Sequence, residues 1–317
     1  PPAVKAHGDP NCVNFAGYTA LMLAVGGGYR EVVALLLQAG GNANYSLGGL
    51  TPLMIAAAAG QIEVCRMLIN CGAHNHPIDK NGRTALHRAS NSGHPEVCHL
   101  LLQANSSVDA DDTEGHTPLM LAAEEGHHSV IQVLLCAGAQ VARVCLDGES
   151  ALIKSVVGKE EVSLELLLKA GAPVNAPSRG GVGDTALIAA ARHGSESMIK
   201  RLLQFQAQVN LPNQRRETPL MVAAEAKHDR VVHQLCVAGS DTTLQDLQGY
   251  TALIRAAAGG SSAVVSICLD FGASPSHASP VDSNTAMTVA AFYGHTEVYN
   301  VLIKAGACVG AIDNSLD

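Results

Sequence analysis

Small and apolar residues recur along this chain in one order, with a period of about 33 residues. In each period a Thr or Ser precedes Ala or Pro and then an apolar residue, and an Ala-rich stretch follows. The hydroxyl can cap a helix, and Pro suits the first helical position because the N–H there has no intrahelical acceptor. The pattern predicts a short first helix, of about two turns, in each repeat. The repeats start near Thr19, Thr51, Thr84, Thr117, Ser150, Thr185, Thr218, Thr251 and Thr285.

A second apolar pattern follows, with residues at helical spacing such as Val298, Val301 and Leu302. It predicts a longer, outer second helix that ends at a Gly. Polar residues come next, commonly an Asp and a Gly as in Asp79 and Gly82, and predict a tight projecting turn, here called the finger. Since neither short helix can bury its apolar face alone, neighbouring repeats must stack. The predicted fold class is all-α, a solenoid forming one array across residues 1–317.

Two stretches carry the repeat most clearly, G-H-T-P-L-M-L-A-A at 115–123 and G-Y-T-A-L-I-R-A-A at 249–257. With such motifs in phase along nearly its whole length, the chain resembles the ankyrin-repeat family. The resemblance implies stacked helix–turn–helix repeats with projecting β-turn fingers. The family's usual His after T-P-L occurs only at His87, whereas the other repeats carry Met, Ile or Thr. We therefore expect apolar packing to replace the hydrogen bonds of that His in the other repeats.

The resemblance also implies a protein-binding module that holds its partner on the concave surface between the fingers and the first helices. The expected partner is a protein or peptide segment, extended or helical and of mixed charge, and the expected role is that of a scaffold or adaptor within a larger protein. We expect Arg83 and Arg88 to pair with carboxylates of the partner, and Phe292 and Tyr293 to cover an apolar side chain. A mechanical spacer that positions neighbouring domains is the alternative. The candidate contact residues are Tyr18, Leu50, Arg83, Arg88, Asn91, His116, Glu124, Glu125, Glu149, Arg192, Glu217, Tyr250, Arg255, Phe292 and Tyr293.

Composition narrows the possible partners. Of 317 residues, 47% are hydrophobic but only 3% are aromatic, which favours thin and closely stacked layers. The 20 Lys and Arg against 28 Asp and Glu give a net charge of −8, which opposes nucleic-acid binding; Arg179, Arg215 and Arg216 at finger tips are too few to reverse it. No apolar run approaches the roughly 18 residues of a membrane span, so no membrane insertion is expected.

Catalysis and cofactor binding are not expected. His94, His127, His228 and His295 occupy one position of the repeat and are predicted to be structural, and the fourteen histidines show no four-ligand zinc spacing. No nucleophile, base and oxyanion site fall together, so we predict no enzyme activity, no cofactor or metal and no small-molecule substrate. The nine cysteines lack a C-x-x-C pair, and Cys65 and Cys98 are predicted to be buried. This usage suits a reducing compartment, the cytoplasm or nucleus, rather than secretion.

Two features depart from regular repetition. The repeat lengthens near 176–184, where glycines raise the entropy lost on ordering. Separately, the pair Gly158-Lys159 shifts the Gly that usually ends a first helix. We expect a soft segment at 176–184, with a longer but ordered finger as the alternative. Lys5–Asn11 resembles the tail of an earlier repeat, so we also expect the sequence to be an excerpt of a longer protein.

Overall fold

A computed structural model describes residues 9–178 and 180–307, and the chain divides into two compact units, Pro1–Leu146 and Asp147–Asp317. The first helices of unit 1 are α1 (Ala20–Gly26), α3 (Pro52–Ala58), α5 (Ala85–Asn91) and α7 (Pro118–Glu124). Its second helices are α2 (Arg30–Gln38), α4 (Ile62–Asn70), α6 (Pro95–Gln103) and α8 (His128–Cys136).

Unit 2 has the same alternation of helices. Its first helices are α9 (Ala151–Val157), α11 (Ala186–His193), α13 (Pro219–Glu225), α15 (Ala252–Gly259) and α17 (Ala286–Phe292). Its second helices are α10 (Glu161–Lys169), α12 (Glu196–Gln204), α14 (Asp229–Val237), α16 (Ser262–Asp270) and α18 (Thr296–Lys304). The predicted short first helix and longer second helix are confirmed, as is the all-α repeat solenoid.

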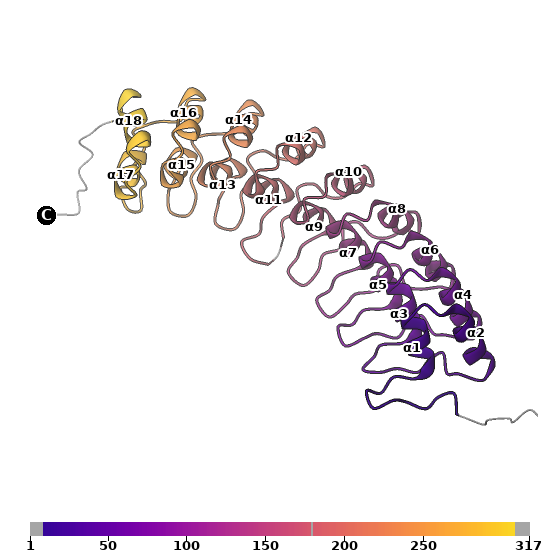
Figure 1. The fold of residues 1–317 in the computed structure, drawn as a ribbon. Coiled ribbons are helices and arrows are strands. Elements are labelled where there is room, and N and C mark those ends of the chain that lie inside the picture. The colour runs from indigo at the N-terminus through magenta and orange to yellow at the C-terminus, as the bar shows by residue number, and fades with distance from the viewer. Residues whose placement is uncertain (1–8, 179, 308–317) are drawn as a thin grey trace, which may run out of the picture. The chain divides into compact units, whose positions relative to one another are not determined.

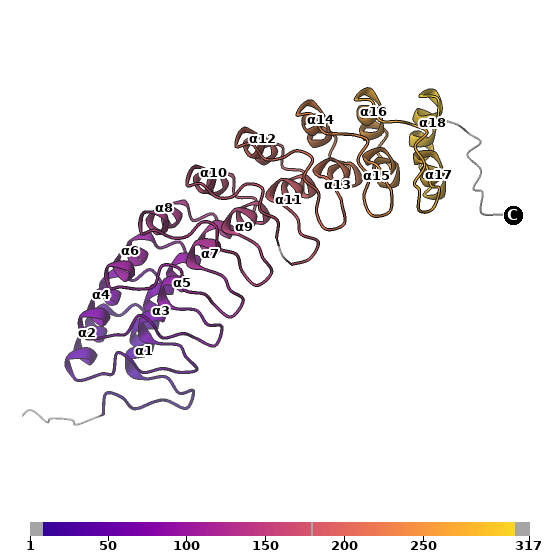
Figure 2. The same ribbon diagram turned by 180° about the vertical axis from the view of Figure 1, so that it is seen from behind.

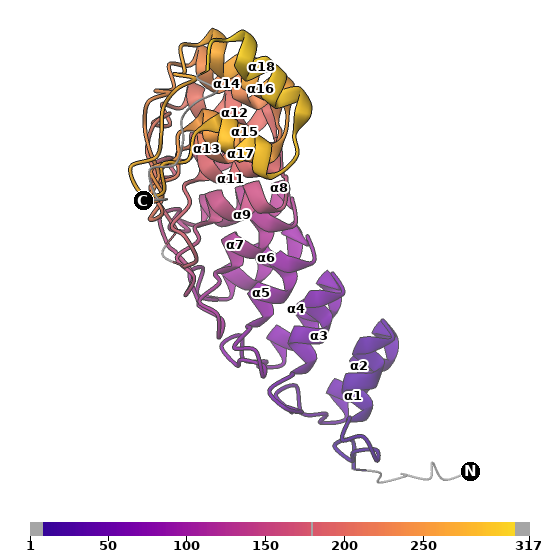
Figure 3. The ribbon, with the colours of Figure 1, turned by 90° about the vertical axis from the view of Figure 1, so that its left-hand side faces the viewer.

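Each unit is built of two helical layers. First helices pack on first helices and second helices on second helices, as α3 does on α5 and α14 on α16. Figures 1 and 2 show, within each unit, the fingers extending past the first helices on the side away from the second helices. In Figure 3, which views unit 2 end on, α18 lies above α17 and the fingers leave on the left. We call the surface made by fingers and first helices the inner face, and that of the second helices the outer face.

Hydroxyl side chains begin the first helices as predicted. Thr51 Oγ1, for example, accepts a hydrogen bond from the Met54 N–H, and Pro52 follows at the first helical position. Such a cap stabilises a helix by about 1 kcal/mol. Thr251 is the exception among the first helices, since its side chain makes no capping bond. The hydroxyl of a Thr or Ser therefore caps each of these first helices except α15.

Small residues on the first helices allow these helices to lie close together. Ala56, Ala57, Ala122 and Ala123 are completely buried. Cys65 lies in the core as predicted, and burial raises the pKa of its thiol to about 12. Cys98 is also buried, and the pKa of its thiol is raised to about 11 by burial. Both thiols therefore pack as small apolar groups and stay protonated at neutral pH.

Several fingers are closed by an Asp or Asn that accepts hydrogen bonds from the backbone N–H groups two and four residues later. Asp112 Oδ1 accepts from the Glu114 and His116 N–H groups at 2.9 and 2.8 Å. In the longer finger the Ser178 N–H donates to the Asp184 carbonyl at 2.9 Å, the same closing bond that Asp79 makes to Arg83. Arg179 lies outside the described residues. Greater softness at 176–184 stays a prediction, and hydrogen exchange faster there than in other fingers would confirm it.

A Gly and a His lock successive repeats together within each unit. The His127 Nε2 atom hydrogen bonds to the Asn91 carbonyl at 3.0 Å, and its ring lies over Gly93, where an added Cβ would be 2.6 Å from Nδ1. Gly93 has a φ of 76°, a left-handed conformation that favours glycine. The same bond recurs at His94, His228 and His295. The structural role predicted for these histidines is therefore observed.

Candidate functional site

The arginines of unit 1 on the inner face already have partners inside the chain. Arg83 Nε lies 3.2 Å from Asp112 Oδ2, and the Arg88 guanidinium pairs with Asp79. Burial alone would raise the pKa of the Asp79 carboxyl, but the Arg83 and Asn81 N–H groups and the Arg88 guanidinium hold it below its usual value. The pKa of Asp112 is lowered for the same reasons: the His116 and Glu114 N–H groups and Arg83 outweigh burial. Both carboxylates therefore stay ionised within the fingers.

His87 links its helix to two fingers. Its Nδ1 accepts from the Thr84 N–H at 3.1 Å, and its Nε2 bonds to the His116 carbonyl at 3.0 Å. Burial is the main cause that lowers the pKa of His87, so the ring is neutral near pH 7. At the same position Met54 and Met120 are almost completely buried. The expected apolar replacement of the His is therefore observed at these positions.

The other candidate residues of unit 1 offer less chemistry. Tyr18 and Leu50 are half-buried, and Leu50 forms an isolated bridge with Leu47. Asn91 gives its carbonyl to His127. Glu124 is half-buried and Glu125 is exposed at the end of α7. The inner face of unit 1 therefore presents small groups followed by carboxylates.

Unit 2 holds a hollow of about 410 Å³ on its inner face. The side chain of Arg255 bonds to Asp246 and lies 3.3 Å from Glu225, and its guanidinium sits 5.3 Å from the centre of the Tyr250 ring. Tyr250 in turn donates to Asp282 at 2.6 Å. Burial would lower the pKa of Arg255, but Asp246 and Glu225 raise it. The residues lining the hollow are Arg192, Arg215, Glu217, Glu225, Asp246, Leu247, Gln248 and Arg255.

Two paired groups border this hollow, and a third pair lies elsewhere in unit 2. Arg192 bonds to Asp184 at 2.8 Å, and the Asn213 amide donates to both Asp184 and Glu217 at 2.8 Å. Glu149 pairs with Lys154 at 3.0 Å. Arg215 differs, because no carboxylate lies within ion-pair distance of it among the residues that the structure describes. Its guanidinium is exposed.

An aromatic pair ends the inner face of unit 2. Phe292 and Tyr293 are 83% and 58% exposed, and their rings meet edge to face at 5.1 Å. Tyr293 also stacks on His295 at 6.0 Å. In unit 1 the equivalent positions carry no aromatic residue. The predicted aromatic surface is therefore exposed.

Four sequence-based candidates have a different setting from the one expected. Arg83 and Arg88 are satisfied by Asp112 and Asp79, so a partner carboxylate would have to compete with an internal one. His116 and Glu217 are only 8% and 7% exposed because their N–H groups close a finger. These four residues help to hold the fingers in shape, Arg83 and Arg88 through their side chains and His116 and Glu217 through their N–H groups.

The comparisons with known proteins agree with this geometry. A family model described as ankyrin repeats (3 copies) matches residues 3–79, 73–145, 105–178, 157–246 and 220–313. The chain belongs to the ankyrin-repeat family. The crystal structure of the ankyrin repeat domain of Bcl-3, described as a unique member of the IkappaB protein family, is similar at a TM-score of 0.63 and 29% identity. The match covers 70% of this chain and 99% of that one. No curated protein matches the chain.

The sequence pattern marked Lys159 of this ankyrin-repeat chain only as an irregularity and gave no sign of Lys227. Lys159 and Lys227 have φ values of 62° and 65° and occupy the turn position between first and second helix. The other turns carry Gly at this position: Gly28, Gly60, Gly93, Gly126, Gly194, Gly260 and Gly294. The repeats that follow the two lysines carry Ser195 and Ser261 at the position where His locks four of the other repeats. A small Ser leaves room for a Cβ, and this pairing was visible in the aligned sequence.

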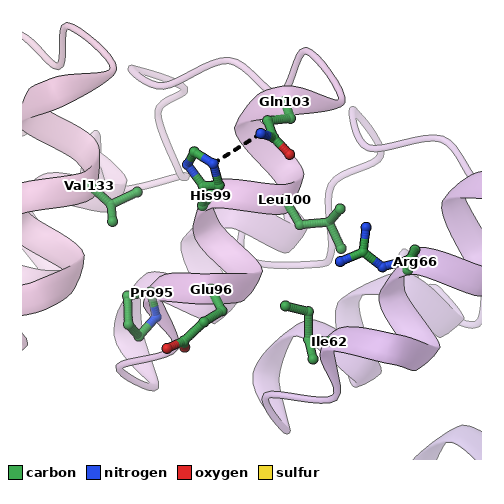
Figure 4. A pocket seen from close by; sticks show the side chains of 8 residues that line it. All are labelled: Ile62, Arg66, Pro95, Glu96, His99, Leu100, Gln103 and Val133. Atoms are coloured by element: carbon green, nitrogen blue, oxygen red, sulfur yellow. Dashed lines mark hydrogen bonds between the residues drawn. The ribbon is translucent and has the colours of Figure 1, made fainter.

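The outer face of unit 1 has a hollow of about 380 Å³ between α4 and α6 (Figure 4). Ile62, Leu100 and Pro95 line it, and Gln103 bonds to His99 at 3.0 Å on its rim. It is a gap between neighbouring second helices, and none of the candidate contact residues lines it. The structure therefore gives no reason to place a binding site there.

Two other kinds of site are absent from the described part of the chain. Residues 9–178 and 180–307 contain no group of three or more His, Cys, Asp or Glu able to hold a metal ion. Within the same ranges, none of the helices has the length and apolar character needed to cross a bilayer. Ankyrin repeats are in general modules for protein–protein interaction, and proteins built from them are generally non-catalytic.

Proposed function

We propose that the chain is a protein–protein interaction module that binds a protein segment on its inner face. The observation that carries the proposal is the Phe292–Tyr293 pair, which is exposed at positions where the earlier repeats have no Phe, Tyr or Trp. Large exposed aromatic groups contribute strongly to binding because they bury much area at little entropic cost. Tyr250 and Arg255 lie on the preceding repeat of the same face and extend this surface.

The test uses the full chain and a displayed library of random peptides. Selected peptides should bind at least about tenfold more weakly to a Phe292→Ser, Tyr293→Ser double variant. Val237→Ser is the matched control, because Val237 is 65% exposed but lies on the outer helix α14. Peptides unaffected by the inner-face variant, or no saturable binding at all, would leave the spacer role as the better explanation.

We infer a scaffold or adaptor role in a reducing compartment, the cytoplasm or nucleus. The buried thiols of Cys65 and Cys98 support this, since each fills the core as a free thiol. Fractionation of cells expressing the natural full-length protein would test the location, and recovery from the secretory pathway would contradict it.

A further inference from the structure

We propose that unit 2 binds an acidic segment of a partner protein along a basic row formed by Lys159, Arg192, Arg215 and Lys227. The hollow lined by Arg192 and Arg215 would take one carboxylate of that segment. The proposal rests on the proposed function and adds the chemistry of the partner. It also moves the anion-binding site away from Arg83 and Arg88, which the sequence favoured.

Most of the basic row lies along the ends of three packed helices, and Arg215 lies on the finger that precedes α13. Lys159 follows α9, Arg192 and His193 end α11, and Lys227 follows α13. Helix α11 contacts both α9 and α13, so these turns are successive neighbours on unit 2 (Figure 1). Burial lowers the pKa of His193, and the charges of Lys159, Arg192 and His228 lower it further. His193 is therefore neutral near pH 7, and Lys159 and Arg192 both lie close enough to it to raise the local potential together.

Most of the row is free to bind a partner, because three of its side chains form no ion pair within the described part of the chain. In the part of the chain that the structure describes, no carboxylate forms an ion pair with Lys159, Lys227 or Arg215. Arg192 has Asp184, but its side chain remains 45% exposed. The two lysines also adopt a left-handed conformation that glycine takes elsewhere in the repeat, at a conformational cost of about 1 kcal/mol each. Lysine at these turns is thus a departure from what the fold prefers.

The carboxylates that face the hollow are already engaged. Glu225 and Asp246 pair with Arg255, and Glu217 accepts from Asn213 at 2.8 Å. An entering carboxylate therefore meets Arg215 without an internal competitor. With a net charge of −8, the whole chain repels a long polyanion such as nucleic acid, so a short acidic protein segment fits better.

The row also sets the length of the segment. Packed helices lie about 9 Å apart, so the two steps from Lys159 to Lys227 span roughly 18 Å. An extended chain rises about 3.3 Å per residue, and roughly six residues would cover that distance. A segment of about ten residues reaches the row with a margin at each end.

The first experiment measures fluorescence anisotropy of a labelled Glu-rich peptide, about ten residues long, with the full chain. The Glu-rich peptide should bind at least about tenfold more tightly than its Gln counterpart, and raising the salt from about 0.05 to about 0.3 M should weaken it. Oligothymidylate of similar length is the nucleic-acid probe. Equal binding of the Gln peptide, or tighter binding of the oligonucleotide, would overturn the proposal.

The second experiment compares two double variants of equal net charge. Lys159→Gly with Lys227→Gly removes two charges and relaxes the backbone, so folding is preserved, and affinity should fall about tenfold. Lys200→Gln with Lys304→Gln removes two charges from the outer helices α12 and α18 and should leave affinity unchanged. Equal losses from both doubles would mean non-specific attraction and refute the site.

The peptide library separates this inference from the proposed function. Acidic selected peptides that need both the lysines and the aromatic pair support both. Selected peptides that need Phe292 and Tyr293 but carry no acidic residues leave the proposed function standing and defeat the acidic-segment proposal. If no peptide depends on the inner face, both proposals fail.

Discussion

In unit 1 the turn after each first helix carries a Gly, and α7 ends in Glu124 and Glu125. In unit 2 Lys159 and Lys227 take that turn after α9 and α13, Arg192 lies in the last turn of α11, and the aromatic pair ends α17. Both units hold arginines against carboxylates of the fingers, Arg83 and Arg88 in unit 1 and Arg192 and Arg255 in unit 2. Unit 2 adds Arg215, Lys159 and Lys227, which have no ion-pair partner among the described residues. One repeat geometry therefore carries a charged network that serves the fold in both units, and in unit 2 it also carries cations open to partners. Four substitutions test that contrast, beginning with the largest effect.

The network of unit 1 should be essential to its stability. Asp112→Ala removes the acceptor of two backbone N–H groups and the partner of Arg83, and should lower the free energy of unfolding by about 3 kcal/mol. Urea unfolding followed by circular dichroism measures this, since the chain has no Trp. Glu114→Ala is the control in the same finger, because its side chain is 73% exposed and should matter little. Equal effects of the two would remove the contrast between the units.

The Gly–His lock explains where unit 2 tolerates its lysines. Gly93→Ala should destabilise the chain by about 2 kcal/mol, through left-handed strain and contact with the His127 ring. In a His127→Ser background the contact disappears, and the cost should fall to about 1 kcal/mol. A double-mutant cycle of unfolding free energies measures this coupling. Additive effects would show that the Ser after each lysine is incidental.

His87 makes the stability of unit 1 depend on pH in a way that the Met, Ile or Thr at this position of the other repeats does not. Replacing it as His87→Met, the residue found in several repeats, should cost about 1 kcal/mol near neutral pH through lost hydrogen bonds to Thr84 and His116. The folded pKa of His87 is lowered below 6.5, so the unfolded chain takes up the proton first as the pH falls. Its contribution is present above pH 6.5 and is lost on acidification. The stability gap between wild type and variant should therefore narrow at lower pH, and a constant gap would contradict this.

The fold could be predicted from the sequence because the repeat signals agree with one another. Thr51 caps a first helix, Ala56 packs in the core, and Gly93 adopts the left-handed turn, each at the position that the 33-residue period predicts. The same alignment also predicted which positions lie on the inner face. It could not predict which group each of these side chains contacts. Whether Arg83 faces solvent or Asp112 depends on the distance between adjacent fingers, which a one-dimensional pattern does not contain. A lysine at the turn position of Gly looks like an irregularity within a single repeat. Its reason becomes visible only when the next repeat is aligned, where Ser195 or Ser261 replaces the locking His.

The smallest effect has the opposite sign. Lys159→Gly should stabilise unit 2 by about 0.5 kcal/mol, because glycine adopts the φ of 62° with less strain while the unfolded chain gains some entropy. Lys227→Gly should act alike, and Lys200→Gln on an outer helix should change stability by less than either. Urea midpoints measured at equal salt would resolve the differences. A gain in stability together with weaker binding of the acidic peptide would show that the lysines serve binding at the expense of folding stability. A loss of stability would mean that the lysines support packing, and the proposed difference between the two units would then be wrong.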